Sequence, residues 1–277
     1  MSISSTMEPH ERPAIEFDSV RLGFDEGDVL RNLSFRVMPR ETVVLLGETG
    51  TGKTLSLKLA AGLLKANSGT VRVLDKDLGE MSERELLRFR RGIGFVFQEG
   101  ALFDSMTVAD NVAYRLLEDH DDPDEIEPKV REALRFVELE RTMELTPPEL
   151  SGGMRRRVSI ARALITRPPI VLYDSPTAGL DPVTSQTIIT LILRFRDIYG
   201  VTALLATQRL QDGFALANFY FDQKSNRVVR DGEHAAKNGS NAAATRFLVL
   251  RGGQVYFEGS PEELASSSDS YLTRFLV

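Results

Sequence analysis

Three short apolar runs stand out along the chain because none of them alternates with polar positions. They cover residues 42–46, 169–173 and 201–206. A strand that is buried on both faces, as in a parallel sheet, shows this pattern. Residues 93–97 give a further strand-like segment, and residues 184–199 have helical periodicity. Buried strands that alternate with helices predict an α/β domain.

The first part of the chain has a different pattern. Residues 15–17 and 20–22 alternate between apolar and polar positions, and residues 30–37 resemble a further strand. Such alternation is typical of half-buried strands. We therefore expect the fold to begin near Ala14, after a flexible N-terminus of residues 1–13.

Helical patterns dominate residues 98–164, where 108–117 and 128–137 are amphipathic. The acidic run 118–127 between these two helices predicts a solvated loop. A polar stretch, residues 221–245, is expected to be an inserted loop or a hairpin.

The pattern of strands returns after this insertion. Residues 247–250 and 254–257 flank an Arg-Gly-Gly turn and predict a strand pair. A helical tail over residues 261–277 follows. We place a single domain over residues 14–260.

Composition excludes several classes of function. The 277 residues carry 34 Lys and Arg against 40 Asp and Glu, and the net charge of -6 argues against a general nucleic-acid binder. The absence of Cys removes disulfides, thiolate metal sites and Cys nucleophiles, and the three His are widely separated. No run approaches the roughly 18 apolar residues of a membrane span, and the polar N-terminus does not resemble a signal peptide. The cytosol is the expected location.

The strongest chemical signal follows the first apolar run, where Gly-Glu-Thr-Gly-Thr-Gly-Lys-Thr fits the pattern G-x-x-x-x-G-K-[ST]. Glycines let the backbone wrap around a phosphate, and the helix that starts there adds its positive N-terminal dipole. Lys53 is expected to reach the β- and γ-phosphates of a nucleotide, and Thr54 to help hold Mg²⁺. The predicted nucleotide-binding loop comprises Gly47, Glu48, Thr49, Gly50, Thr51, Gly52, Lys53 and Thr54.

A carboxylate follows the second apolar run. Asp174 stands at the carboxyl end of that predicted strand, beside the nucleotide in an α/β fold. An Asp in this place can enter the coordination sphere of Mg²⁺ together with Thr54. The sequence thus predicts a Mg²⁺-nucleotide site.

A third motif narrows the class of nucleotide-binding protein. Leu-Ser-Gly-Gly-Met opens a helix at residues 150–154, and Ser151 with two glycines forms a second helix N-terminus suited to an anion. With this motif the chain resembles the ATP-binding cassette (ABC) ATPases over roughly residues 14–260. Gln98, which follows residues 95–97, matches the family's Q-loop, and residues 175–182 match its D-loop region. The resemblance assigns nucleotide contacts to Phe24, Gln98, Ser151, Gly152 and Gly153, and a metal contact to Gln98.

The resemblance implies a P-loop cassette with a mixed or parallel core sheet, an N-terminal antiparallel β subdomain and a helical signature subdomain over about residues 99–165. It also implies a dimer in which each ATP lies between the phosphate loop of one cassette and the LSGGM of the other. Residues 99–114 (EGALFDSMTVADNVAY) are similar to the Mla-type ATPases, which act in phospholipid transport with MCE-type lipid-binding proteins. An integral-membrane permease is expected to contact this segment on the inner face of the cell membrane.

Two positions depart from the family pattern. Ser175 stands where the family has a catalytic Glu, and Gln208 where it has a His that contacts the γ-phosphate. A hydroxyl is too weak a base at neutral pH to replace a carboxylate, and Gln cannot carry charge. The hypothesis is that the chain binds Mg-ATP but hydrolyses it slowly. A nucleotide-sensing pseudo-ATPase scaffold and the degenerate half of a heterodimeric cassette pair remain as alternatives.

Overall fold

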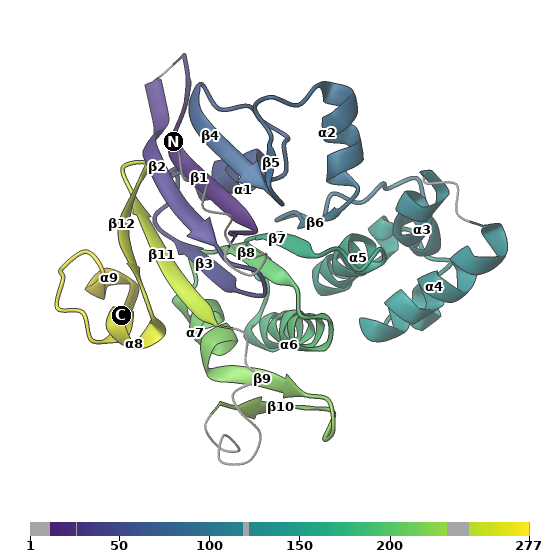
Figure 1. Ribbon diagram of the computed structural model, residues 1–277. Coiled ribbons are helices and arrows are strands. Elements are labelled where there is room, and N and C mark those ends of the chain that lie inside the picture. Colours follow the sequence, from purple (N-terminus) through teal and green to yellow (C-terminus); the bar gives the residue numbers. More distant parts are fainter. Residues whose placement is uncertain (1–11, 26, 119–121, 232–243, 277) are drawn as a thin grey trace.

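The computed structural model describes residues 12–25, 27–118, 122–231 and 244–276. A six-stranded sheet in the order β12-β11-β3-β8-β7-β6 forms its centre (Figure 1). Five of these strands run parallel, and β12 adds an antiparallel edge. The strands are β3 (Thr42–Leu46), β6 (Ile93–Val96), β7 (Ile170–Asp174), β8 (Thr202–Ala206), β11 (Thr245–Arg251) and β12 (Gln254–Gly259).

The three apolar runs form β3, β7 and β8 in the middle of this sheet, and every residue of these strands is buried. Successive side chains of a strand point to opposite faces, so each strand contributes to two cores. Val43 and Leu45 belong to the core on one face, whereas Val44 and Leu46 belong to the core on the other. This arrangement explains why the runs show no alternation.

A second sheet covers one of these faces. It is antiparallel, with the order β2-β1-β4-β5, and α1 packs into the same core as both sheets. Its bulged strand β1 joins the two alternating segments that the sequence suggests, and Ser19 at the bulge has a φ of 53°. The elements are β1 (Ile15–Phe24), β2 (Gly27–Val37), β4 (Ser68–Val73), β5 (Lys76–Asp77) and α1 (Lys53–Ala60).

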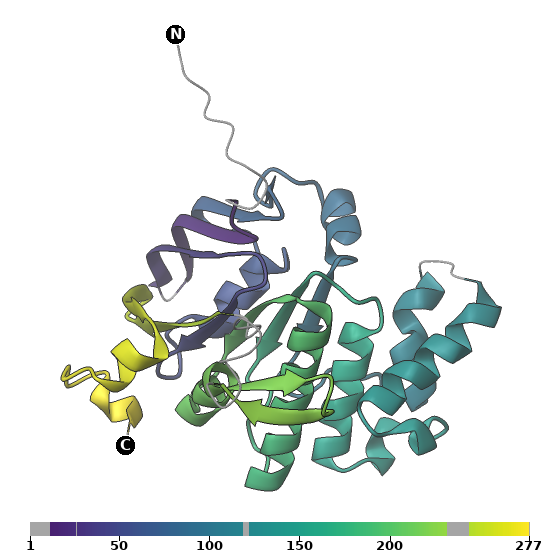
Figure 2. The same cartoon turned by 60° about the horizontal axis from the view of Figure 1, so that its bottom comes forward.

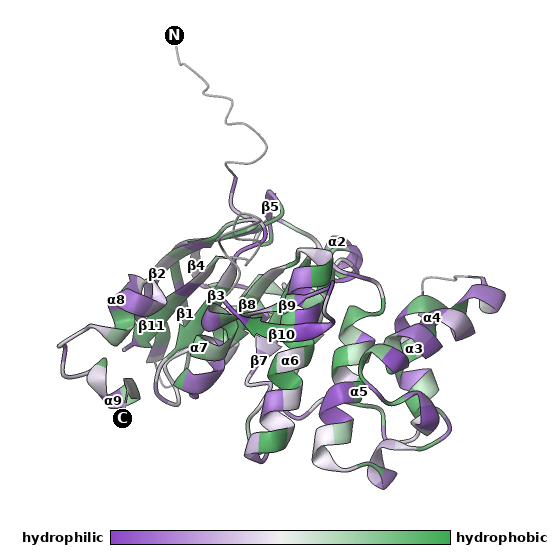
Figure 3. Ribbon diagram, turned by 90° about the horizontal axis from the view of Figure 1, so that it is seen from below, coloured by the Kyte–Doolittle hydropathy of each residue, from purple (hydrophilic) through white to green (hydrophobic). Residues whose placement is uncertain are grey.

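Helices cover the opposite face of the central sheet, and α3 and α4 extend to one side as an arm (Figure 2). Figure 3 shows hydrophobic colouring concentrated in the strands and in stripes on α5 and α6. No described helix is long and apolar enough to cross a membrane. The helices are α3 (Val108–Glu118), α4 (Pro123–Phe136), α5 (Gly152–Leu164), α6 (Pro182–Tyr199) and α7 (Leu210–Asn218), with 3-10 turns at Glu140–Thr142 and Pro147–Glu149.

The loop predicted over residues 118–127 is wrong for its second half, because α4 begins at Pro123. The Asp122 side chain accepts a hydrogen bond from the Asp124 backbone N–H at 3.0 Å. Pro is favourable at the first helical position, and acidic side chains in the first turn complement the helix dipole. The acidic residues therefore start the helix, and residues 119–121 lie outside the described part.

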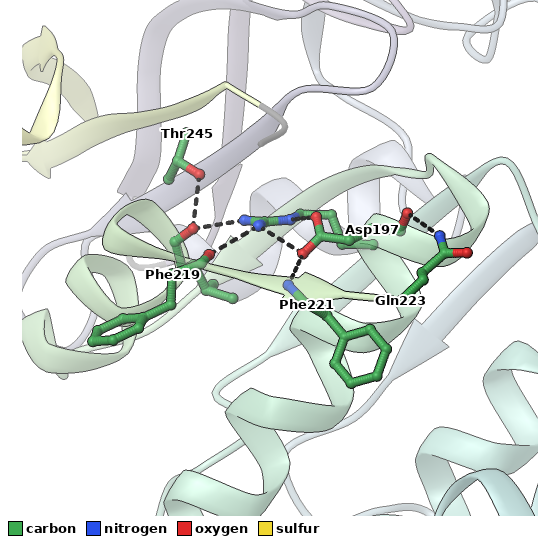
Figure 4. Close-up of polar contacts among 7 residues, drawn as sticks. Asp197, Phe219, Phe221, Gln223 and Thr245 are labelled. Carbon is green, nitrogen blue, oxygen red and sulfur yellow. Dashed lines mark hydrogen bonds and ion pairs between the residues drawn. The ribbon is translucent and has the colours of Figure 1, made fainter. Parts of the chain in front are cut away.

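Part of the predicted insertion over residues 221–245 is a two-stranded antiparallel ribbon, β9 (Phe219–Asp222) and β10 (Arg227–Arg230). A buried ion pair on α6 supports it (Figure 4). The Asp197 carboxylate accepts hydrogen bonds from Arg196 at 2.6 and 3.1 Å and from the Phe221 backbone N–H at 2.6 Å. Arg196 also donates to the carbonyl oxygens of Leu216 and Phe219. Residues 232–243 of the predicted insertion lie outside the described part.

The helical tail predicted from residue 261 contains two short helices, α8 (Pro261–Ala265) and α9 (Thr273–Leu276). Tyr271 and Leu272 before α9 are buried in the helix-side core. The sequence interpretation missed α2 (Glu83–Arg90), although a capping box of Ser82 and Glu85 marks its start. Most of the predicted N-terminus, residues 1–11, lies outside the described part.

Candidate nucleotide-binding site

The loop between β3 and α1 has three glycines with positive φ, Gly47, Gly50 and Gly52. Gly47 has a φ of 149°, and a Cβ built there would lie 2.6 Å from the carbonyl oxygen of Leu250 on β11. Gly52, with a φ of 99°, precedes α1, and a Cβ there would lie 2.2 Å from Leu30. Other residues adopt such backbone angles only at a cost. The glycines of the motif therefore fit the turn from strand to helix.

Lys53 lies over this loop with only 7% of its surface exposed. Its ammonium Nζ donates hydrogen bonds to the carbonyl oxygens of Gly47 at 2.7 Å and Glu48 at 2.8 Å. Burial lowers the pKa of Lys53, and the charges of Asp174 and Glu48 oppose this effect. The loop thus holds a cation close to the amide groups of the first turn of α1, an arrangement that suits a polyphosphate.

Asp174 ends β7 beside the start of α1. The Thr54 hydroxyl donates a hydrogen bond to its Oδ1 at 3.0 Å, and the carboxylate is 5% exposed. Burial raises the pKa of Asp174, against the opposing effects of Thr54, Lys58, Lys53 and Arg156. A hydroxyl and a carboxylate are hard oxygen donors, and Mg²⁺ in nucleotide sites takes only one or two protein ligands of this kind. The pair that the sequence predicts for the metal is therefore together and chemically suitable.

The two positions that depart from the family also lie at this edge. Asp174 and Ala206 are register partners on β7 and β8, and the Ser175 backbone N–H donates to the Ala206 carbonyl oxygen at 2.8 Å. Ser175 has a φ of 47°, in the left-handed region. The Gln208 side-chain amide donates to the Thr49 hydroxyl at 3.2 Å. Ser175 thus directly follows the metal candidate, and Gln208 touches the phosphate loop.

Gln98 and Phe24 lie at the margins of the site. Strand β6 pairs with β7 through Val96 and Tyr173, so Gln98 follows β6 at the same sheet edge as Asp174, and it is exposed. Phe24 ends β1 with 57% of its surface exposed, so core packing does not account for this aromatic side chain. Its exposure leaves the ring accessible to an adenine base.

The signature motif forms a separate helix N-terminus. The Ser151 side chain caps α5 by accepting from the Met154 backbone N–H at 3.2 Å. A Cβ on Gly153 would lie 2.4 Å from the Thr184 side-chain methyl, so any larger residue there would force Thr184 on α6 to shift. Within the described residues, no hydrogen bond joins Ser151, Gly152 or Gly153 to the phosphate loop. The structure therefore does not bring the two predicted phosphate-binding elements together in one chain.

Sequence reasoning missed a cluster behind Gln208. Asp212 on α7 accepts hydrogen bonds from the hydroxyls of Thr177 and Thr207, and Arg209 lies beside it. The one signal in the sequence was an acidic residue in the first turn of an amphipathic helix, which is ordinarily exposed. In the structure Asp212 is 3% exposed.

The site combines a strand, a glycine loop with a buried Lys, and a strand-terminal Asp paired with a Thr. These features define a P-loop nucleotide-binding protein. The chain belongs to the ABC transporter family, whose family model matches residues 30–178. The fold class predicted from the sequence, a P-loop ABC cassette with a mixed core sheet and an antiparallel β subdomain, is confirmed.

Curated relatives include methionine import ATP-binding protein MetN of Bifidobacterium longum, 36% identical over 216 residues that cover 78% of this chain and 51% of that protein. The chain thus spans about half the length of this relative. Intermembrane phospholipid transport system ATP-binding protein MlaF of Haemophilus influenzae is 32% identical over 214 residues, with 76% and 81% coverage. Among solved structures, the dimeric ATP-binding cassette MJ0796 bound to ADP and Pi has a TM-score of 0.72 at 27% identity, covering 89% of this chain and 98% of that chain.

Proposed function

We propose that the chain is the ATP-binding subunit of an ABC transporter and closes as a dimer on Mg-ATP to drive a separate permease. The hydrogen bond between Thr54 and Asp174, beside the buried Lys53, is the observation that carries this proposal. It unites the phosphate loop and the metal carboxylate, which are 120 residues apart in the sequence. The dimeric cassette MJ0796 supports the dimer.

The proposed dimer places Ser151, Gly152 and Gly153 of one protomer against the nucleotide of the other. Their separation from the phosphate loop within one chain supports this arrangement. In a homodimer, both nucleotides would face Ser175 and Gln208. In a heterodimer, a partner with the catalytic Glu and His would form one competent site with the intact LSGGM of this chain.

We further propose that the homodimer hydrolyses ATP slowly, because Ser175 and Gln208 supply neither a carboxylate base nor a charged γ-phosphate contact. Loss of a positioned base typically lowers the rate by about 10²–10⁴-fold. The position of Ser175 next to Asp174, with its backbone tied to β8, supports a role for this residue position near the attacking water. A nucleotide-sensing scaffold is the extreme form of the same proposal.

The test combines Ser175→Glu with Gln208→His in one purified chain. We expect ATP to bind the unmodified chain and the double variant with similar affinity, and turnover to rise by about 10²-fold or more in the variant. Adding Lys53→Ala to each protein should abolish the turnover, which controls for contaminating ATPases. Ordinary ABC ATPase rates in the unmodified homodimer would disprove slow hydrolysis without affecting the proposed ATP site.

The segment 99–114 is proposed to contact the permease, and it is a preformed surface. Asn111, fully buried, accepts from the Phe103 backbone N–H and donates to the carbonyl oxygens of Phe103, Met106 and Thr107. Phe103 itself is 42% exposed and lies beside Tyr114, with the two ring planes tilted by 43°. An aromatic side chain on a fixed loop is suited to protein contact.

For the transported molecule, we propose phospholipid, with MCE-type lipid-binding proteins as further partners, on the likeness of residues 99–114 to Mla-type ATPases and the match to MlaF. Methionine import is the second candidate, because MetN proteins are also relatives at 36% identity. Purification of the complex from native membranes, with mass spectrometry of its proteins and lipids, distinguishes the two. An MCE protein supports the first candidate, and a methionine-binding protein the second.

A further inference from the structure

Asp212 connects two loops that border the proposed ATP site. It lies in the first turn of α7, and its Oδ2 accepts hydrogen bonds from the Thr177 hydroxyl at 2.5 Å and the Thr207 hydroxyl at 3.2 Å. Thr177 and Thr207 are 0% and 2% exposed. Thr177 belongs to the loop that follows β7, and Thr207 to the loop that follows β8. One buried carboxylate therefore joins both loops.

Arg209 strengthens this connection from the other side. Its Nε lies 3.8 Å from the Asp212 Oδ1, and its Nη1 donates to the Ser185 hydroxyl at 2.9 Å and to the Thr177 carbonyl oxygen at 3.4 Å. The Arg209 backbone N–H also donates to the Thr207 hydroxyl at 3.0 Å. We call Thr177, Thr207, Arg209 and Asp212 the loop clasp. It has contacts with both loops and with α6.

The buried carboxylate of Asp212 lowers the stability of the fold unless all contacts of the loop clasp are made. Burial raises the pKa of Asp212, and the hydrogen bond from Thr177, the charge of Arg209 and the hydrogen bond from Thr207 offset this only in part. A buried carboxylate loses more free energy when a donor leaves than an exposed one would. The two loops therefore resist separation, and a displacement of one favours a matching displacement of the other.

The ends of the clasp reach different parts of the site. Gln208 lies between two clasp residues and bonds to Thr49 of the phosphate loop. Thr177 lies in residues 175–181, which lead from the metal candidate Asp174 to the start of α6. Val183, in the first turn of α6, is 78% exposed, so this end of the loop meets solvent rather than the core.

We propose that Asp212 is a positioning residue, through which residues 175–181 are displaced when Gln208 contacts a bound nucleotide. The proposal rests on the proposed ATP site and adds a route from that site to a loop whose far end, at Gly179 and Asp181, is exposed. A nucleotide that draws Gln208 toward its γ-phosphate also moves Thr207, and the shared carboxylate passes this displacement to Thr177. No direct contact between nucleotide and residues 175–181 is required.

Hydrogen–deuterium exchange of the full chain with and without Mg-ATP tests this route. In the unmodified chain we expect Mg-ATP to slow exchange about tenfold in peptides covering residues 47–54, 175–181 and 206–212. In Asp212→Leu, which keeps a similar size but removes both acceptor oxygens, protection of 47–54 should remain while that of 175–181 is lost. Thr177→Val, which removes one hydroxyl, should give the same split.

Thr187→Val is the matched control, because the Thr187 hydroxyl donates to the Val183 carbonyl oxygen within α6 and takes no part in the clasp. It should keep all three protected regions. Full protection of 175–181 in the two clasp variants overturns the proposal, and so does its absence in the unmodified chain. A loss of protection at residues 47–54 as well would show a structural role only. Failure of the proposed ATP site is distinct, since no region of any protein would then respond.

Discussion

Two buried carboxylates at opposite ends of the α6 region have opposite surroundings. Asp197 accepts three hydrogen bonds, two from Arg196 and one from the Phe221 backbone N–H, and it supports the β9–β10 ribbon (Figure 4). Asp174 accepts one hydrogen bond among the described residues, from Thr54. The side chain of Asp197 is 6% exposed and the whole Asp174 residue is 5% exposed, so both carboxylates are largely shielded from water.

Asp197 and Asp174 differ in the number of hydrogen-bond donors around each carboxylate. A buried charge that is paired and accepts several hydrogen bonds holds neighbouring elements in place, and removal of its partner leaves an uncompensated buried charge. A buried charge with one donor costs folding free energy, and the raised pKa of Asp174 reflects that cost. The comparison suggests that Asp197 serves the fold and Asp174 serves a ligand.

The largest expected effect comes from Asp197→Asn, which leaves Arg196 buried without its partner charge. We expect the free energy of unfolding, measured with urea, to fall by about 3–5 kcal/mol. ATP affinity should not change under conditions where the variant is folded. Glu127→Gln is the control, because its pair with Arg131 is exposed on both sides, and its effect should stay within about 0.5 kcal/mol. Equal losses in the two variants would contradict the distinction.

A smaller effect is expected at the adenine end of the site. Phe24→Ala removes an exposed ring, so the free energy of unfolding should change by less than about 0.5 kcal/mol. Loss of base stacking should weaken ATP binding by about 1–3 kcal/mol, measured by calorimetry. Leu87→Ala, another large exposed apolar side chain, should affect neither quantity. A destabilised Phe24→Ala with normal ATP affinity would assign Phe24 to the fold.

The smallest effect has the opposite sign from that at Asp197. Asp174→Asn should raise the free energy of unfolding by about 1 kcal/mol at neutral pH. The Mg²⁺-dependent part of the ATP affinity should fall about tenfold. The folded-state pKa of Asp174 is raised above its ordinary value of 3.8, so the folded state binds the proton more tightly than the unfolded state. Ionisation therefore costs stability as pH rises through the raised pKa.

The gain from Asp174→Asn should accordingly be full above that raised pKa and should vanish as pH falls below the ordinary value of 3.8. Urea unfolding of both proteins across this range measures it. A gain that grows as pH falls, or a loss at neutral pH, would show that Asp174 stabilises the unliganded fold.

The sequence allowed prediction of the elements with strong local patterns. The strands β3, β7 and β8 could be predicted because burial on both faces requires unbroken apolar runs, and the phosphate loop because its glycines are needed by the backbone. The start of α4 could not, since acidic residues suit a helix N-terminus and a solvated loop equally well. The loop clasp could not either, because the burial of Asp212 depends on loops that meet only in the folded chain.

The buried amide of Asn111 makes the shape of a surface loop independent of the exposed side chains on that loop. One buried amide fixes the main chain of the loop that contains Phe103, and it does so without using the loop's own side chains. The outward-facing residues can therefore change by mutation while the loop keeps its shape. Under the proposed contact with a permease, a few surface substitutions on this loop would fit the cassette to a new membrane partner without any change to the nucleotide-binding residues.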